Sequence, residues 1–238
     1  MQPVHTKTNV GFLIIFLMII TLIGFYPTYI SKFPSFTNIT TIHHFHGAMM
    51  MTWFLLLIIQ PFLISYNKYT IHRTLGKLSY VIAPLVLFSI FLAARGEYYR
   101  DTQYQTENEG LAGLALDLTN IVAFAICYLL AILNRHNTPY HMRYMICTAI
   151  LMLGPGMMRV IAVYKIFGDI DFPTNVLYTY AISIGISLGL IIYDLIKRNP
   201  YKPYLVVIAL MAGIYITYLY RMSDAWLGIA KKIAELTF

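Results

Sequence analysis

The segment VGFLIIFLMIITLIGFYPTYI, residues 10–30, runs for 21 residues without a charged side chain. A helix of this length rises about 30 Å, which matches the hydrocarbon core of a bilayer. Six further segments have similar length and character: 44–65, 75–94, 111–133, 142–163, 175–196 and 203–220. The sequence therefore predicts an all-α fold, a polytopic membrane helix bundle of about seven transmembrane helices.

The composition supports this prediction. Of 238 residues, 59% are hydrophobic and 11% are charged, with a mean hydropathy of +0.67, whereas soluble domains carry about 25% charged residues. The first apolar run is too long for a signal peptide and no small-residue cleavage site follows it, so we expect a retained helix. We expect residues 1–221 to form a single transmembrane domain, with a functional core at about 43–163.

Basic residues set the expected orientation. Nine occur on one side of the predicted spans: Lys7, Lys68, Arg73, Lys77, Arg135, Arg143, Lys197, Arg198 and Lys202. Only four occur in the opposite loops: Lys32, Arg95, Arg100 and Lys165. The excess predicts a cytoplasmic N-terminus and an external C-terminus in a bacterial inner (plasma) membrane. Because the net charge of +7 is spread over span ends, we expect the lipid bilayer, and no nucleic acid, as a partner.

The last segment, 222–238, differs in character from the spans. Its apolar residues fall near one helical face: Trp226, Ile229, Ala230, Ile233 and Leu236. This pattern predicts an amphipathic interfacial helix, which Ser223 would cap. Docking of another membrane subunit is the alternative interpretation.

One candidate site lies at the outer ends of the spans. His43, His46 and Met50 share a helical stripe, and Met157 lies at similar depth. Histidine with methionine suits copper or mixed iron ligation, so these four are candidate metal ligands.

An intramembrane polar pair is expected at the same depth. Asp117 and Arg159 are charges inside spans, each costing about 3 kcal/mol on insertion scales, so they are expected to pair. Asn120 lies on the Asp117 face. Two interpretations stay open: a structural ion pair with interfacial histidines, or a site for a metal, a haem edge or a quinone head group.

A second candidate site lies at the inner ends. His72-Arg73 opens the third span, and His141-Met142-Arg143 opens the fifth. Two imidazoles on different helices at one depth can ligate a b-type haem, and Arg73 and Arg143 could neutralise its propionates. Contact with lipid head groups and helix-end hydrogen bonding are the alternative.

A family resemblance rests on one pattern of residues, which is His46…Met50…Trp53…Gln60…His72-Arg73-x-Leu75-Gly76 followed by His141-x-Arg143-x-Met145. Over about residues 43–163 the chain resembles a group of poorly characterised bacterial multi-span membrane proteins and, more remotely, the two-haem transmembrane cytochromes b. That resemblance implies a four-helix core with paired histidine ligands. The fourth span lacks a histidine, so at most one bis-histidine haem, on His72 and His141, carries over.

Three functions follow as hypotheses. The first is a membrane redox or electron-transfer protein, with one b-type haem and quinone as its partner. The second is a non-enzymatic accessory or assembly subunit of a larger membrane complex. The third is a small-solute or metal transporter that uses Asp117 and Arg159. No Walker loop, nucleophile elbow or HExxH motif occurs, so enzymatic activity is left open. The two cysteines, Cys127 and Cys147, are expected to be free buried thiols.

Overall fold

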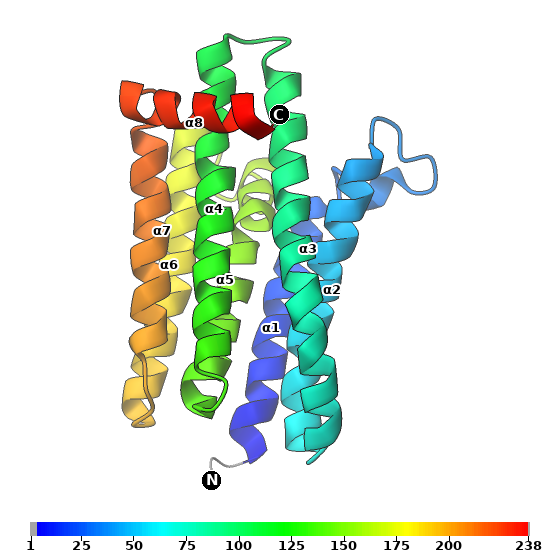
Figure 1. The fold of residues 1–238 in the computed structure, drawn as a ribbon, viewed down its shortest axis with the longest axis vertical. Helices are drawn as coiled ribbons and strands as arrows, with labels where there is room; N and C mark the ends of the chain where they lie inside the picture. The colour runs from blue at the N-terminus through cyan, green and yellow to red at the C-terminus, as the bar shows by residue number, and fades with distance from the viewer. Residues whose placement is uncertain (1–3, 238) are drawn as a thin grey trace.

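The structure is a computed structural model that describes residues 4–237, folded into a bundle of long helices (Figure 1). The elements are α1 (Val4–Phe25), the 3-10 turn η1 (Ile30–Lys32), α2 (Thr41–Ser65), α3 (Tyr69–Asp101), α4 (Glu107–Leu133), α5 (Thr138–Val163), α6 (Phe172–Ile196), α7 (Lys202–Leu219) and α8 (Asp224–Thr237). Seven of them, α1 to α7, are long and apolar enough to cross a membrane. The predicted all-α polytopic bundle is confirmed, and the chain is a multi-pass membrane protein.

Two of the helices depart from their predicted spans. α1 ends at Phe25 rather than at residue 30, because Tyr26 precedes Pro27 and a residue before proline avoids the helical conformation. α3 continues over 33 residues to Asp101, a length of about 50 Å. Its last turns therefore project with the start of α4 beyond the end of the bundle (Figure 1).

The fifth helix is the centre of the bundle. α5 packs against α1, α2, α4, α6 and α7. Inside the protein, 61% of its apolar window is buried, compared with 22% for α1. Most side chains of α5 therefore meet protein rather than lipid.

Close contact between backbones joins α1 to α5. A Cβ atom built on Gly24 would collide with the carbonyl oxygen of Gly156, and one built on Gly156 would lie 2.7 Å from the Cα of Thr21. Small residues allow this close approach of membrane helices. The helix continues through the Gly154-Pro155-Gly156 segment as part of α5.

Helices α2 to α5 form a four-helix ring. α2 packs on α3, α3 on α4, α4 on α5, and α5 on α2. α3 and α5 therefore stand opposite one another across the ring, as do α2 and α4. The middle of the ring is filled by aromatic side chains, because Trp53 of α2 lies 5.3 Å from the Phe124 ring and 5.5 Å from the Tyr128 ring of α4. Within this layer Trp53 Nε1 donates to the hydroxyl of Thr148 in α5 at 3.1 Å, whereas the histidines and the charged residues of the four helices lie toward the two ends of the bundle.

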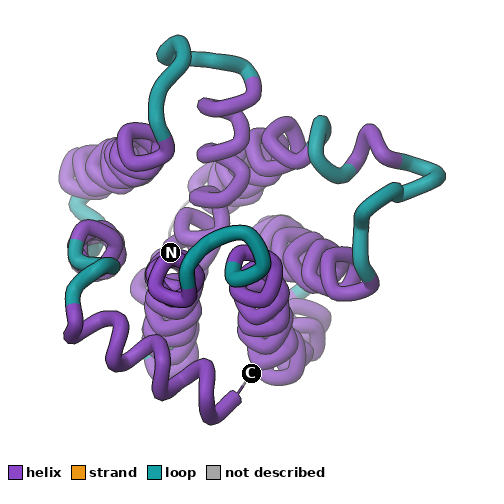
Figure 2. The backbone as a smooth tube through the Cα atoms, turned by 90° about the horizontal axis from the view of Figure 1, so that it is seen from above, coloured by secondary structure: helices purple, strands orange, loops and turns teal. Residues whose placement is uncertain are grey.

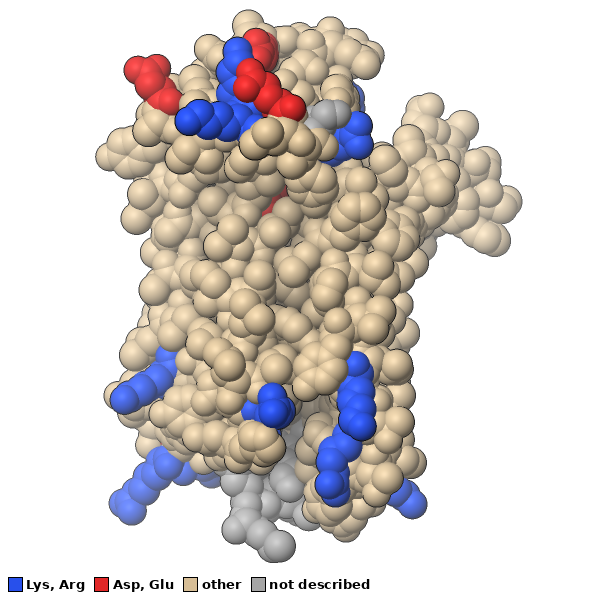
Figure 3. Space-filling model, viewed as in Figure 1, with Lys and Arg blue, Asp and Glu red and all other residues tan. Residues whose placement is uncertain are grey.

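The two ends of the bundle differ in charge. One end, called the basic end here, carries Lys68, Arg73, Lys77, Arg135, Lys197, Arg198 and Lys202. The other, the mixed-charge end, carries Glu97, Arg100, Asp101, Glu107, Lys165 and Asp169. In Figure 3 only basic side chains are visible at the lower end, whereas acidic and basic ones mix at the upper end.

α8 runs across the bundle axis at the mixed-charge end (Figure 1) and follows its rim in the view from above (Figure 2). Ala230 is fully buried, and Trp226 Nε1 donates to the carbonyl of Leu111 in α4 at 3.1 Å. Ser223 Oγ accepts from the N–H of Trp226 at 3.3 Å, which caps the helix. Leu236 is 84% exposed. The inner face of the tail helix is thus bound to the bundle, and part of its apolar surface stays open.

The loop before α6 ends in a similar cap. The Asp171 carboxylate accepts from the N–H of Thr174 at 3.0 Å. Hydrogen bonds from Thr174 hold the pKa of this exposed carboxyl below its usual range. This capping fixes where α6 begins at the mixed-charge end.

Candidate functional site

The inner polar layer of the ring begins with His141, in the first turns of α5. Its Nδ1 atom lies 2.8 Å from the carbonyl oxygen of Ala131 in α4. A carbonyl only accepts hydrogen bonds, so Nδ1 carries the proton and Nε2 keeps its lone pair. His141 therefore presents a hydrogen-bond acceptor, or a ligand atom, at Nε2.

His72, in α3, has the opposite tautomer. The side-chain amide of Gln60 in α2 is assigned so that both its ends are satisfied, with its oxygen accepting from the Gly76 N–H at 3.1 Å. Its NH2 group then donates to the His72 carbonyl oxygen at 3.3 Å and to His72 Nδ1. Because Nδ1 accepts, the proton of the neutral ring sits on Nε2. His72 therefore presents a donor.

The two rings lie at the same end of the bundle. His72 and His141 lie within electrostatic range of one another, on the helices that stand opposite across the ring. One offers an N–H group and the other a lone pair. This pair can hold a polar ligand that has both an acceptor and a donor, and it can pass a proton to or from that ligand.

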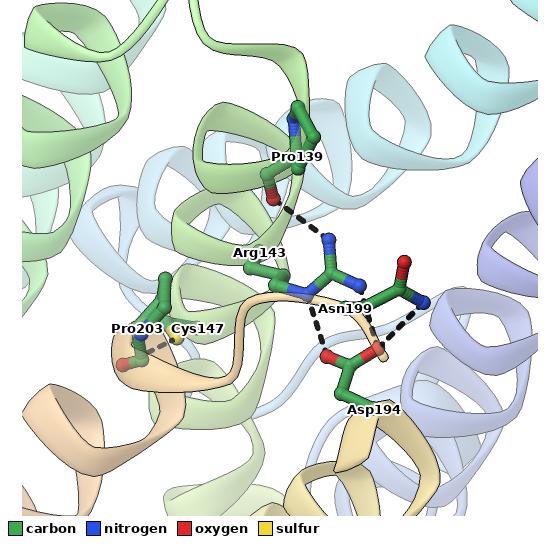
Figure 4. A network of polar contacts seen from close by, with 6 residues as sticks. All are labelled: Pro139, Arg143, Cys147, Asp194, Asn199 and Pro203. Carbon is green, nitrogen blue, oxygen red and sulfur yellow. Dashed lines mark hydrogen bonds and ion pairs between the residues drawn. The ribbon is translucent and has the colours of Figure 1, made fainter. Parts of the chain in front are cut away.

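Arg143 has a partner that sequence reasoning missed. It is 2% exposed, and its Nε and Nη2 atoms each donate to the Asp194 carboxylate of α6 at 2.5 Å (Figure 4). Nη1 donates to the Pro139 carbonyl at 2.8 Å, and Asn199 donates to Asp194 at 3.3 Å. Asp194 is the only charged residue within span 175–196. That lone intramembrane carboxylate was the signal for a buried cation.

Arg73, the other arginine expected beside a haem, is exposed at the basic end. Its Nε donates to the carbonyl of Tyr69 one turn earlier in α3 at 3.4 Å. The guanidinium of Arg143 is thus held by α6, while that of Arg73 lies on the surface.

The outer polar layer contains His46, half-buried in α2. Ser89 of α3 donates its hydroxyl to the Val86 carbonyl at 2.7 Å, so it accepts from His46 Nδ1 at 3.1 Å. His46 Nε2 therefore keeps a lone pair. His43 instead closes a capping box, in which its Nδ1 accepts from the Thr40 N–H at 3.2 Å. His43 thus caps the start of α2, whereas His46 points into the four-helix ring, toward Ser89 of α3.

Asp117 and Arg159 lie within electrostatic range of one another, and Glu97 of α3 lies in range of both. Over the described residues, 4–237, ion pairs within 4.0 Å join other residues. The Arg159 guanidinium donates to the Pro155 carbonyl at 3.0 Å and sits 4.3 Å from the centre of the Phe25 ring. In place of the expected close ion pair, Asp117 and Arg159 thus form a looser cluster of charges together with Glu97.

Asn120 connects this cluster to α6. Its Nδ2 donates to the Leu116 carbonyl at 2.8 Å and to the Tyr180 hydroxyl at 3.2 Å. Sequence reasoning missed Tyr180, because a tyrosine among twenty gives no distinguishing signal.

The candidate methionine ligands lie in apolar surroundings. Met157 is 8% exposed within the hydrophobic core, and Met50 packs against that core. Within residues 4–237, no three or more histidine, cysteine, aspartate or glutamate side chains are grouped so as to hold a metal ion. Copper at the outer layer stays a prediction.

No family model, curated protein or solved structure matches the chain. The two polar layers, at the two ends of the four-helix ring, are therefore the features of the molecule that point to a function.

Proposed function

We propose that this protein is a membrane redox protein that binds a quinone head group between His72 and His141. The complementary hydrogen bonding of the two rings carries the proposal. A quinone carbonyl accepts from the Nε2–H of His72, and a hydroquinone hydroxyl donates to Nε2 of His141. Reduction of a quinone takes up two electrons and two protons, and His141 Nε2 is placed to exchange one of those protons.

The same position was predicted to hold a b-type haem, and the residues fit that group in part. His141 fits an axial ligand, because a carbonyl holds its Nδ1–H and leaves Nε2 for a metal. His72 does not fit, because Gln60 donates to its Nδ1 and its Nε2 is protonated. His72 suits the quinone and His141 suits its hydroquinone, whereas only His141 suits a haem iron.

The setting of the proposed site agrees with a bilayer-soluble ligand. The proposed site lies at the basic end, and the excess of lysine and arginine there favours the cytoplasmic face of a bacterial inner membrane. A lipid-soluble quinone reaches this depth from the hydrocarbon region, while its head group requires polar partners there.

Fluorescence of Trp53 provides the test. The chain has two tryptophans, so Trp226→Phe leaves the Trp53 ring, inside the four-helix ring, as the single reporter. Titration with a short-chain ubiquinone in lipid nanodiscs should quench it saturably. His72→Ala should weaken binding of the quinone about 10-fold, and His141→Ala should weaken binding of the corresponding hydroquinone, measured by competition, about 10-fold, because loss of one hydrogen bond to a ligand costs about 1.4 kcal/mol. The exposed His136→Ala is the matched control and should leave affinity unchanged.

Gln60→Glu sharpens the test by reversing the His72 tautomer. A carboxylate only accepts, so it places the proton on His72 Nδ1 and turns Nε2 into an acceptor. Quinone affinity should fall as far as in His72→Ala, although both histidines remain. Unsaturable quenching, or equal affinity in all variants, would contradict the proposal. A Soret band that shifts on reduction and is absent in His72→Ala would show that the ligand of these histidines is a haem and not a quinone.

A further inference from the structure

A groove runs between α4 and α7 on the outer surface of the bundle. Its volume is about 260 Å³, and residues of these two helices line it. Ala123 and Ile214 are buried and form its floor, whereas Val122 is exposed at its edge. Because α4 and α7 are both membrane-spanning helices, the groove opens to the hydrocarbon of the bilayer.

Gly213 of α7 keeps the groove open. A Cβ atom built on Gly213 would meet no atom of the described chain within 4 Å. This glycine differs from Gly24, where a Cβ atom would collide with the backbone of Gly156. A larger side chain at position 213 would therefore enter the groove without displacing any described part of the protein.

The two hydroxyl groups that line the groove are both bonded to their own helices. Thr217 Oγ1 donates to the carbonyl of Gly213 at 3.0 Å. Thr119 Oγ1 donates to the carbonyls of Ala115 and Leu116. Neither threonine has an O–H proton left for a ligand, and the other lining residues are apolar. A polar ligand would find no donor here, whereas a hydrocarbon chain needs none.

The first turn of α8 closes the groove at the mixed-charge end. α8 begins at Asp224, shortly after α7 ends at Leu219, and it crosses to α4 (Figure 1). There Trp226 Nε1 donates to the carbonyl of Leu111 at 3.1 Å. Leu111 lies eight residues before Thr119, which is about 12 Å along α4.

This closure selects the kind of occupant that the groove can take. A membrane-spanning helix is about 10 Å wide and has to reach both surfaces of the bilayer, so a helix seated in the groove would meet α8. A single acyl chain is narrow and flexible, so it can pass beside α8 and lie in the groove.

We propose that the groove between α4 and α7 binds one acyl chain of a membrane phospholipid, in the leaflet at the mixed-charge end. An apolar cavity of about 150 Å³ holds the six carbons of benzene, so a volume of about 260 Å³ has room for about ten carbons. The groove extends from Ala209 to Thr217, about 12 Å along α7, which fits within one leaflet. The inference does not depend on the histidine site, which lies at the other end of the bundle.

Native mass spectrometry of the full-length protein counts the bound lipid. The protein is purified in a detergent with a rigid steroid body, which does not fit a groove one chain wide, and is mixed with palmitoyl-oleoyl phosphatidylcholine. The natural chain should retain one lipid more than Gly213→Leu, whose side chain fills the groove. Gly185→Leu on α6 is the matched control, because a Cβ atom there also meets no described atom within 4 Å. It should retain as many lipids as the natural chain.

Thermal unfolding in the same detergent shows whether Gly213→Leu is folded. Without phospholipid this variant should be at least as stable as the natural chain, because leucine takes the place of the acyl chain. Phospholipid at about 100 times its Kd should raise the unfolding midpoint of the natural chain and of Gly185→Leu by about 5 °C, and that of Gly213→Leu by much less.

Equal lipid retention by the natural chain and Gly213→Leu would overturn the inference, and so would equal stabilisation of all three proteins by phospholipid. A dimer of the natural chain that Gly213→Leu converts to a monomer would also overturn it, because the occupant of the groove would then be a second copy of the chain.

Discussion

Arg143 and Asp194 place two full charges in the apolar interior, each about 2% exposed. Removing ions from water is costly, and only close, multiple hydrogen bonds offset that cost. Here the guanidinium makes two bonds to the carboxylate and one to a backbone carbonyl. The pair joins α5 to α6 and holds the end of α5 that carries His141.

Arg143→Ala is expected to destabilise the protein by about 3–5 kcal/mol, because it leaves the Asp194 carboxylate buried without its partner. The double variant Arg143→Ala/Asp194→Ala should recover part of that loss. Thermal unfolding in detergent measures both. Arg73→Ala, which removes an exposed arginine at the same end, is the control and should change the midpoint little. A midpoint for Arg143→Ala equal to that of the control would contradict this role.

Among the elements, α1 serves as the support for the central helix. Its Gly24 meets the backbone of Gly156 in α5 with no room for a side chain. Backbone atoms cannot turn aside as a flexible side chain does, so the crossing depends on the missing Cβ. Because α5 carries His141, Cys147 and Arg159, the crossing with α1 helps to position these residues.

Gly24→Ala should therefore destabilise the bundle by about 1–3 kcal/mol, the usual cost of overpacking a close contact. Gly189→Ala on α6 is the matched control, because its Cβ would meet nothing within 4 Å. That control should be neutral or slightly stabilising, since alanine favours a helix over glycine. Unfolding midpoints of the two variants give the comparison, and equal midpoints would count against close packing at the crossing.

At the scale of the whole molecule, the expected orientation in the membrane follows from the difference in charge between the two ends of the bundle. Lysine and arginine resist transfer across the membrane, so the basic end is expected on the cytoplasmic side. The tail helix α8 then lies at the external face, where the exposed Leu236 can enter the lipid interface. The proposed quinone site is then expected at the opposite, cytoplasmic face.

Fusions to a phosphatase that folds only outside the cytoplasm test this orientation. A fusion after residue 238 should be active, whereas one after Asn199, in the loop between α6 and α7, should be inactive. A fluorescent protein that folds only in the cytoplasm should give the reverse pattern. Phosphatase activity of the fusion after Asn199, together with none for the fusion after residue 238, would show that the orientation is the reverse of the expected one.

Much of the architecture could be predicted without coordinates. Every backbone polar group inside a bilayer needs an internal partner, so a long apolar segment has little choice but a helix. The predicted spans therefore match α2 and α4 to α7 within a few residues. The exceptions depend on local chemistry: Pro27 ends the first helix early, and α3 runs on past its apolar stretch because a helix does not have to stop at the membrane surface.

For the candidate site, the sequence could predict which residues take part but not which of them contact one another. Intramembrane histidines, Asp117 and Arg159 are visible in the sequence because polar groups are costly in lipid. Which of them meet depends on the rotation and crossing of each helix, and hydropathy does not specify these. The contacts of Asp194 with Arg143 and of Gln60 with His72 join residues that are 51 and 12 positions apart.

The sequence by itself thus determined that the chain crosses a membrane about seven times, because that outcome depends on the transfer energy of each segment taken alone. The tertiary structure decided which helices stand opposite one another, where the protons of His72 and His141 reside, and that Asp194 is the partner of Arg143. Those features arise from pairwise contacts between helices, and such contacts exist only once the helices have packed.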